Sequence, residues 1–162
     1  MAMSLFASAI VEGRPVRMFN YGQIRRDFTY IDDVAQAVVR LLELAPAPNP
    51  NWSESCPDPA SSSAPWRVYN IGNNRSVEVC RVLALLEAEL SRPAIIEFEP
   101  MQPGDVPETC ADVDELARDV QFRPETAIEE GVRRFVTWYC AYHRVPAGAA
   151  KDLTGRSEDY GE

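Results

Sequence analysis

The sequence predicts a mixed α/β fold in which helices alternate with a few short strands. Residues 79–90 and 128–142 carry apolar side chains at the three- and four-residue spacing of one helix face. Short β-prone runs at residues 16–19 and 94–98 lie between segments that contain glycine and proline, as strands often do. With 162 residues and 46% apolar content, the chain is long enough to bury one core.

The first elements are a helix and a strand. Residues 2–12 predict a short helix, which Gly13 and Pro15 end. Residues 16–19 then predict a strand, and residues 20–22 have the Asn-Tyr-Gly composition of a turn.

A second helix follows residues 28–31, which are β-prone by residue type. Asp32 suits the N-cap of that helix, because its carboxylate can accept a nearby backbone N–H. The helix is apolar almost all round, so we expect it to be covered on more than one side and infer a missing neighbour. Its apolar residues are Val34, Ala35, Ala37, Val38, Val39, Leu41, Leu42 and Leu44.

Residues 45–66 change sharply in composition. Six prolines and a serine run at 61–63 predict an irregular excursion rather than a helix or strand. Residues 67–72 then predict a buried strand, which Gly72 ends.

The middle of the chain predicts a helix, a strand and a loop. Ser76 suits the N-cap of the helix. Residues 94–98 predict a strand, residues 102–107 a tight proline–glycine loop, and a short helix begins near Asp112. The face of the first of these helices that we expect to be buried consists of Val79, Val82, Leu83, Leu86 and Leu90.

The last helix has the clearest pattern. Thr126 and Glu129 have the spacing of a capping box at its start. We therefore expect one folded region over residues 1–143 and a polar, disordered tail over residues 144–162. The apolar stripe of this helix consists of Ile128, Val132, Phe135, Val136, Tyr139 and Tyr142.

Composition excludes several classes of partner. The net charge of −9 and the pI near 4.7 argue against nucleic acid or an anionic membrane. No run approaches the roughly 18 apolar residues that span a bilayer. Four widely spaced cysteines and the single His143 do not suit a metal site, because zinc ligands usually come in close pairs. We expect free thiols and a cytoplasmic location, where disulfides are rare.

Two adjacent arginines, Arg25 and Arg26, are the first candidates for chemistry. The planar guanidinium group makes bidentate, charge-assisted hydrogen bonds to a phosphate. An alternative is a surface pair that Asp27, Asp32 or Asp33 neutralises. The residues alone leave both interpretations open.

The loop Pro103-Gly104-Asp105 is the second candidate. Glycine lets the backbone approach a ligand closely, and a carboxylate can accept hydrogen bonds from two ribose hydroxyls. The alternative is a strand-to-helix turn in which Asp105 is a local cap.

The ten residues from Arg25 to Val34 resemble the nucleotide-sugar epimerases of the extended short-chain dehydrogenase superfamily, the NAD-dependent epimerase/dehydratase family. The tripeptide at 101–103 and the proline-rich excursion make the resemblance nearest to the UDP-glucuronate 4-epimerases. It covers about residues 1–143. It implies the C-terminal substrate-binding part of an extended Rossmann-type epimerase, without the N-terminal dinucleotide-binding half.

The resemblance assigns three residues to the nucleotide. Arg26 occupies the position that reaches the diphosphate of the UDP-sugar, and Asp105 the position that contacts the uridine ribose. Gln102 stands where many relatives have arginine, which removes one phosphate-binding charge but fits the UDP-glucuronate branch.

Three further residues are implied near the same ligand. Arg17 and Phe19 lie on the strand that flanks the uracil in the family. Phe28 replaces a tyrosine of many relatives, so it keeps the ring and loses the hydroxyl. Phe19 is also a candidate core residue, since an aromatic side chain in a strand usually packs in the core.

The catalytic parts of the family are not found in this sequence. No GxxGxxG or GxGxxG turn for a dinucleotide can be written, and the only lysine, Lys151, has Ala147 four residues before it. The YxxxK pair that supplies the family's base is therefore missing. We assign no catalytic residue, and although the family uses NAD, we expect none to bind this chain alone.

The resemblance thus predicts the UDP-sugar-binding portion of a UDP-glucuronate 4-epimerase-like protein, inactive as an isolated chain. UDP-glucuronate is the expected ligand, and a separate Rossmann half or a homodimer partner is the expected protein contact. One alternative is a fragment of a nucleotide-sugar dehydratase or decarboxylase of the same superfamily. Another is a non-catalytic chain of a split enzyme.

Overall fold

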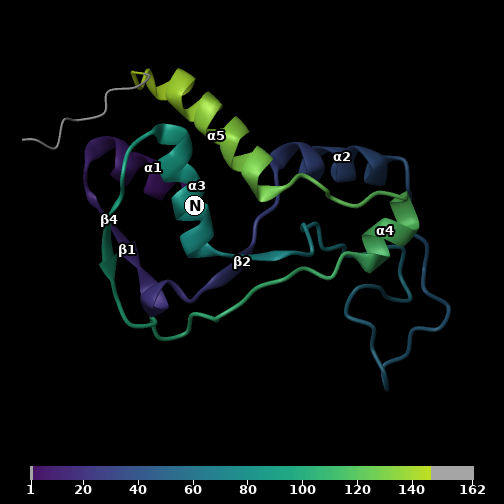
Figure 1. Ribbon diagram of the computed structural model, residues 1–162. Coiled ribbons are helices and arrows are strands. Elements are labelled where there is room, and N and C mark those ends of the chain that lie inside the picture. The colour runs from purple at the N-terminus through teal and green to yellow at the C-terminus, as the bar shows by residue number, and fades with distance from the viewer. Residues whose placement is uncertain (1, 147–162) are drawn as a thin grey trace, which may run out of the picture.

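A computed structural model describes residues 2–146 of the chain, so most of the tail predicted at 144–162 lies outside the described residues. The mixed α/β prediction is confirmed (Figure 1). The elements are α1 (Ala2–Glu12), β1 (Pro15–Met18), the 3₁₀ turn η1 (Phe19–Gly22), β2 (Arg25–Asp27), α2 (Ile31–Leu42), β3 (Ser76–Glu78), α3 (Val79–Leu90), β4 (Ile95–Phe98), α4 (Asp114–Val120) and α5 (Ile128–His143).

The core lies around α3, which packs against both α1 and α5. Figure 1 shows these helices gathered with β1 and β4 at one end of the molecule, while α2 and α4 lie at the other end. The prediction for the buried face of α3 is confirmed, because its five members are all buried: Val79, Val82, Leu83, Leu86 and Leu90. On α5, Val132, Val136 and Tyr139 are buried as predicted, whereas Tyr142 is exposed.

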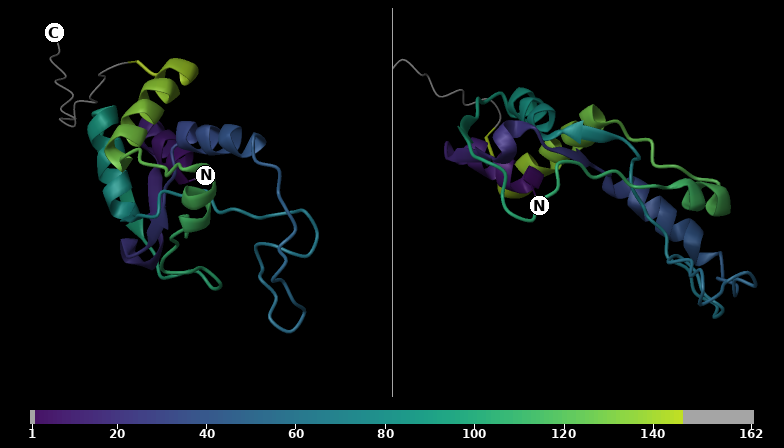
Figure 2. Two further views of the ribbon diagram at one scale, coloured as in Figure 1. Left: turned by 90° about the vertical axis from the view of Figure 1, so that its right-hand side faces the viewer. Right: turned by 90° about the horizontal axis from the view of Figure 1, so that it is seen from below.

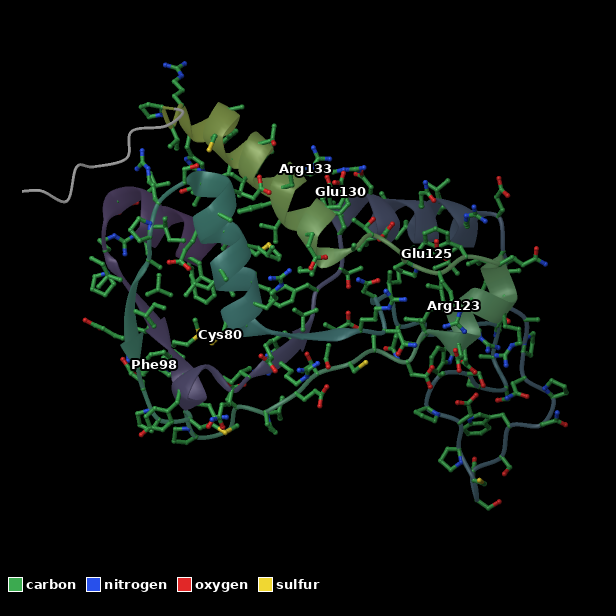
Figure 3. The ribbon with its side chains drawn as sticks, viewed as in Figure 1. Cys80, Phe98, Arg123, Glu125, Glu130 and Arg133 are labelled. Carbon is green, nitrogen blue, oxygen red and sulfur yellow. The ribbon has the colours of Figure 1, made fainter. Side chains whose placement is uncertain are left out.

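The strands form two separate two-stranded sheets. β1 pairs with β4 in parallel, and β2 pairs with β3 antiparallel. All four residues of β4 are exposed, and Ile95 and Phe98 have relative exposures of 55% and 56%. Figure 3 shows Phe98 on β4 and Cys80 near the start of α3, and both side chains lie close to Gly22. This strand therefore presents apolar side chains to solvent.

One predicted strand, at residues 67–72, is wrong, and the β-prone residues 28–31 form none. Residues 28–31 leave the sheet, because only Arg25–Asp27 pair with β3, and Ile31 already begins α2. Residues 67–72 form no strand, and Val68 is exposed. In the described chain, this segment makes only an isolated bridge between Arg67 and Ser61, so it lacks the neighbouring strand that a β-prone segment needs to form a sheet.

Three predicted helix caps are also wrong, and each residue has another partner. Ser76 lies in β3 instead of capping α3. Tyr30 and Ala127 are the N-cap residues of α2 and α5, and neither helix has a side-chain cap. Instead, the backbone N–H of Thr126 donates to the carboxylate of Asp33 at 3.0 Å. This bond joins the starts of the two helices, whereas a capping box would satisfy one helix alone.

Helix α2 is poorly covered, as its apolar composition predicts. Ala37 is its only fully buried residue, and Leu42 is 80% exposed. The exposed apolar side chains on it are Ile31, Val38, Val39 and Leu42. No helix of the described chain is long and apolar enough to cross a membrane.

The excursion predicted at 45–66 contains no helix or regular strand, and Figure 2 shows it projecting from the body of the molecule in both views. Its end is anchored on α4. Arg67 contacts Glu115 and Asp119 at 3.1 and 3.3 Å, and the hydroxyl of Tyr69 donates to Asp119 at 2.8 Å. Burial favours the neutral form of Asp119, but hydrogen bonds from Tyr69 and Arg118 and the charge of Arg67 outweigh it and hold the pKa of Asp119 below its ordinary value.

We predict that Asp119→Asn destabilises the chain at neutral pH, by about 1–2 kcal/mol, because the hydrogen-bonded carboxylate is lost. A carboxylate whose pKa is lowered by folding contributes stability above its unfolded pKa of about 3.9, and this contribution is lost as the pH falls through the folded value. The difference in unfolding free energy between the two proteins, measured by urea denaturation, should therefore shrink below about pH 4. A difference that stayed constant from pH 7 to pH 2 would contradict this role.

Candidate functional site

The candidate site forms where residues 105–111 run beside β2. The N–H of Arg25 donates to the carbonyl of Pro107 at 2.8 Å, and the N–H of Thr109 donates to the carbonyl of Arg25 at 3.2 Å. Residue Glu108 makes a parallel bridge to Arg25, so this segment extends the small sheet on the side opposite β3. The pairing brings the arginine motif and the proline–glycine loop together.

Arg26 and Asp105, both predicted site residues, are in direct contact. Nη2 of Arg26 donates to Oδ1 of Asp105 at 2.5 Å, and Nη1 donates to the carbonyl of Val106 at 2.8 Å. The side chains of Arg26 and Asp105 are 25% and 31% exposed. The pair is thus accessible enough to meet a ligand and enclosed enough for its charges to be screened only in part.

Arg25, in contrast, is held by the protein itself. Its guanidinium donates to the backbone carbonyl of Ser76 at 2.7 Å, to the hydroxyl of Ser76 at 3.1 Å and to Glu78 at 3.2 Å. A further ion pair joins it to Glu108 at 3.4 Å. For Arg25, the surface-pair interpretation is therefore correct, although its partners are not the aspartates expected.

The loop predicted at residues 102–107 is present. The N–H of Asp105 donates to the carbonyl of Gln102 at 3.2 Å, and Gly104 has a φ of +84°, which favours glycine. Oδ1 of Asp105 also accepts the N–H of Val106 at 2.9 Å, but Asp105 caps no helix, because α4 begins at Asp114 with Val113 as its N-cap residue. Gln102 is exposed beside the pair.

Arg17 and Phe19 are joined to each other rather than to Arg26. Arg17 makes a two-point ion pair with Glu99, with 2.6 Å between Nη2 and Oε2. Its Cζ lies 5.2 Å from the ring centroid of Phe19, and that ring packs against the core. The hydrogen bonds from Arg17 hold the pKa of Glu99 below its ordinary value. Strand β1, which carries Arg17, is therefore fixed to Glu99, the residue that follows β4.

Phe28 lies in a different environment, an apolar cavity of about 470 Å³. Tyr30 and Phe135 also line this cavity, and Arg134 places its guanidinium over the ring of Tyr30 at 5.4 Å. Phe28 is thus an apolar wall. Among the described residues, no group of three or more histidine, cysteine or acidic side chains could hold a metal ion.

Asp27, which the sequence did not single out, organises the site. Its carboxylate accepts three backbone N–H groups, from Asn73 at 2.9 Å, Asn74 at 3.1 Å and Ala111 at 2.9 Å. A Cβ added to Gly72 would collide with the Cβ of Ala111 and lie 2.8 Å from Oδ2 of Asp27. In the sequence, Gly72 between Asn70 and Asn73 was the feature that could have indicated this contact, because such a glycine often marks a close approach of two backbone segments.

Comparisons with known proteins show which sequences and folds this chain resembles. Residues 1–53 match the model of the NAD dependent epimerase/dehydratase family. The chain is 46% identical to the protein CapI of Staphylococcus aureus over 144 residues. Over residues 1–53 the chain has the sequence pattern of the NAD dependent epimerase/dehydratase family. The chain is also 42% identical over 145 residues to a probable UDP-glucuronate 4-epimerase of Rhizobium meliloti.

The match covers most of this chain but only part of its relatives. It includes 89% of the chain in both cases, and 43% of CapI and 42% of the Rhizobium protein. Among solved structures, MoeE5 in complex with UDP-glucuronic acid and NAD superposes with a TM-score of 0.69 and 25% identity, over 88% of this chain and 42% of MoeE5. The chain therefore spans less than half the length of these proteins. It has the fold of part of a Rossmann-type epimerase.

We predict opposite effects from adding one methyl group at two glycines. Gly72→Ala should lower the unfolding free energy by about 1–3 kcal/mol, because the new Cβ has no space beside Ala111 and Asp27. Gly131→Ala, the matched control in α5, should raise it by up to about 1 kcal/mol, because alanine favours a helix. Its Cβ would lie 3.5 Å from the Tyr30 ring, an ordinary contact. Urea denaturation measures both, and equal effects would contradict the close approach at Gly72.

Proposed function

We propose that this chain is the UDP-sugar-binding, C-terminal part of a UDP-glucuronate 4-epimerase-like protein. The observation that carries the proposal is the contact between Arg26 and Asp105, which come from segments 79 residues apart in the sequence. A cation for a phosphate and an acceptor for ribose hydroxyls thus stand side by side. MoeE5, whose structure holds UDP-glucuronic acid, has the same fold over this region.

The electrostatics favour a local anion site within an acidic chain. The net charge of −9 repels a diphosphate at long range, so binding has to depend on a nearby positive group. In our proposal, the diphosphate takes over the Nη2 donor that Arg26 now directs at Asp105. The released carboxylate of Asp105 then accepts from the ribose. The ligand exchanges one set of hydrogen bonds for another, so Arg26 and Asp105 each keep a hydrogen-bond partner.

NAD does not fit the residues of this chain. The family binds it with a glycine-rich turn at a helix N-terminus, and no such motif occurs in the sequence. The tyrosine–lysine pair is also absent. We therefore propose that this chain binds the nucleotide of the UDP-sugar. Hydride and proton transfer then require a dinucleotide-binding part of the kind found in the longer relatives.

The exposed apolar surfaces support the need for such a part. Ile95 and Phe98 on β4 and Leu42 on α2 are all more than half exposed. Side chains of this kind are normally buried against a neighbouring element. We propose that they pack against the dinucleotide-binding half in a complete enzyme.

We predict that UDP and UDP-glucuronate stabilise the chain in a thermal-shift assay and that NAD alone does not. Arg26→Ala should weaken UDP binding by about 10- to 100-fold, because a hydrogen-bonded charge contact to the diphosphate is lost. The same substitution should change the affinity for uridine little, because uridine has no phosphate. Asp105→Ala should weaken UDP and uridine by similar factors, since it acts on the ribose. Isothermal titration calorimetry measures each affinity.

Arg14→Ala is the matched control for these variants. Arg14 is an exposed arginine that pairs with Glu12 at the end of α1, outside the site, so its removal should leave UDP affinity unchanged. Circular dichroism checks that each variant is folded. Equal UDP affinity in the wild type and Arg26→Ala would exclude the proposed site, and stabilisation by NAD alone would contradict the division of roles.

A further inference from the structure

Asp27 lies next to Arg26 on β2, but its side chain has a different task. Successive side chains of a strand point to opposite faces, so Asp27 faces away from the Arg26–Asp105 pair. It contacts backbone groups instead, through Asn73, Asn74 and Ala111. Within the described chain, Asp27 forms no ion pair. Its two carboxylate oxygens accept backbone N–H groups instead, so the side chain joins separate backbone segments.

The three donors belong to two segments, at residues 73–74 and at Ala111, and none of the three lies in a strand. Oδ1 accepts the N–H of Asn73, and Oδ2 accepts the N–H groups of Asn74 and Ala111. Only a carboxylate can accept at both oxygens. An asparagine side chain would turn its NH₂ group toward at least one of these N–H donors, which repels it and leaves it unsatisfied. The position is therefore specific for aspartate.

The same carboxylate fixes the segment that carries Asp105. Arg26 Nη1 and Asp105 hold the segment at one end, and the bonds between Arg25 and residues 107 and 109 hold its middle. The bond from Ala111 to Asp27 holds the other end. The loop on the far side is fixed as well, because the amide of Asn70 donates to the carbonyl of Asp112 at 3.2 Å.

We propose that Asp27 is a positioning residue for the nucleotide site: it clamps residues 105–111 onto β2 so that Asp105 stays opposite Arg26. The inference rests on the proposed function for its ligand, and on the three N–H contacts for its mechanism. Without the clamp, the segment keeps its bonds to Arg25 and Arg26 on β2 and the bond from Ser76 to Glu108. Its end at Ala111 is released, however, and the ligand has to order that end on binding. Ordering a loop on binding lowers affinity.

The test compares Asp27→Asn with Asp33→Asn in the full chain. Asp33 is the matched control, because its carboxylate also accepts a backbone N–H, that of Thr126, but joins α2 to α5. In hydrogen–deuterium exchange, Asp27→Asn should speed exchange at 105–111 about tenfold or more, with α3 and α5 unchanged, whereas Asp33→Asn should leave 105–111 unchanged. UDP affinity should fall about tenfold in Asp27→Asn only.

A second measurement needs no substitution. In the wild type, the amides of Asn73, Asn74 and Ala111 should exchange at least about tenfold more slowly than those of an unstructured chain, although they lie outside helices and strands. This measurement decides the outcome if Asp27→Asn does not fold. Unprotected amides at these three positions, or unchanged exchange at 105–111 in a folded Asp27→Asn, would overturn the clamp.

The two proposals fail in different ways. If the wild type does not bind UDP, the proposed function is wrong, while the exchange measurements still decide whether Asp27 clamps the segment. If the wild type binds UDP and Asp27→Asn binds it equally well, the positioning role is wrong and the function stands.

Discussion

The structure depends on side chains that replace sheet ladders as partners for the backbone. Its strands are three or four residues long, and long segments around residues 43–75 and 99–113 have no regular structure. Backbone N–H groups in such segments need an acceptor when water is excluded. Asp27 provides it for the loop at 73–74 and for Ala111, and Asp33 provides it for Thr126. These two carboxylates join elements that local hydrogen bonds leave separate.

Arginines have a corresponding role for carbonyl oxygens. Arg25 donates to the carbonyl of Ser76, Arg26 to that of Val106, and Arg92 to that of Val11 on α1. The two arginines of the motif contact different carboxylates: Arg25 pairs with Glu78 and Glu108, and Arg26 with Asp105. They differ because β2 turns adjacent side chains toward different neighbours.

Patterns that depend on the core were predictable from the sequence. The apolar spacing of α3 and most of α5 gave the right buried residues, because burial of one helix face needs only a correct period. The strands predicted at 16–19 and 94–98 are present within one residue as β1 and β4. Caps were not predictable, since Ser76, Asp32 and Thr126 have equally good partners far along the chain. For the site, a family resemblance predicted Arg26 and Asp105. Asp27 was missed because its three partners are backbone N–H groups, which almost any residue type supplies and which therefore leave no sequence pattern. Arg17 and Phe19 meet Glu99 and the core instead, so their place beside a base stays a prediction.

The exposed strand β4 has a consequence for how the chain behaves in concentrated solution. Within the described chain it pairs with β1 alone, so its other edge offers unpaired backbone groups beside Ile95 and Phe98. An apolar open edge is a template for strand addition by another molecule, and this edge carries little charge to prevent it. The single glutamate of this strand, Glu97, is the one charged residue among its four. Colloidal stability of the isolated chain is therefore limited by this edge, and its strongly negative net charge is the main force that opposes aggregation.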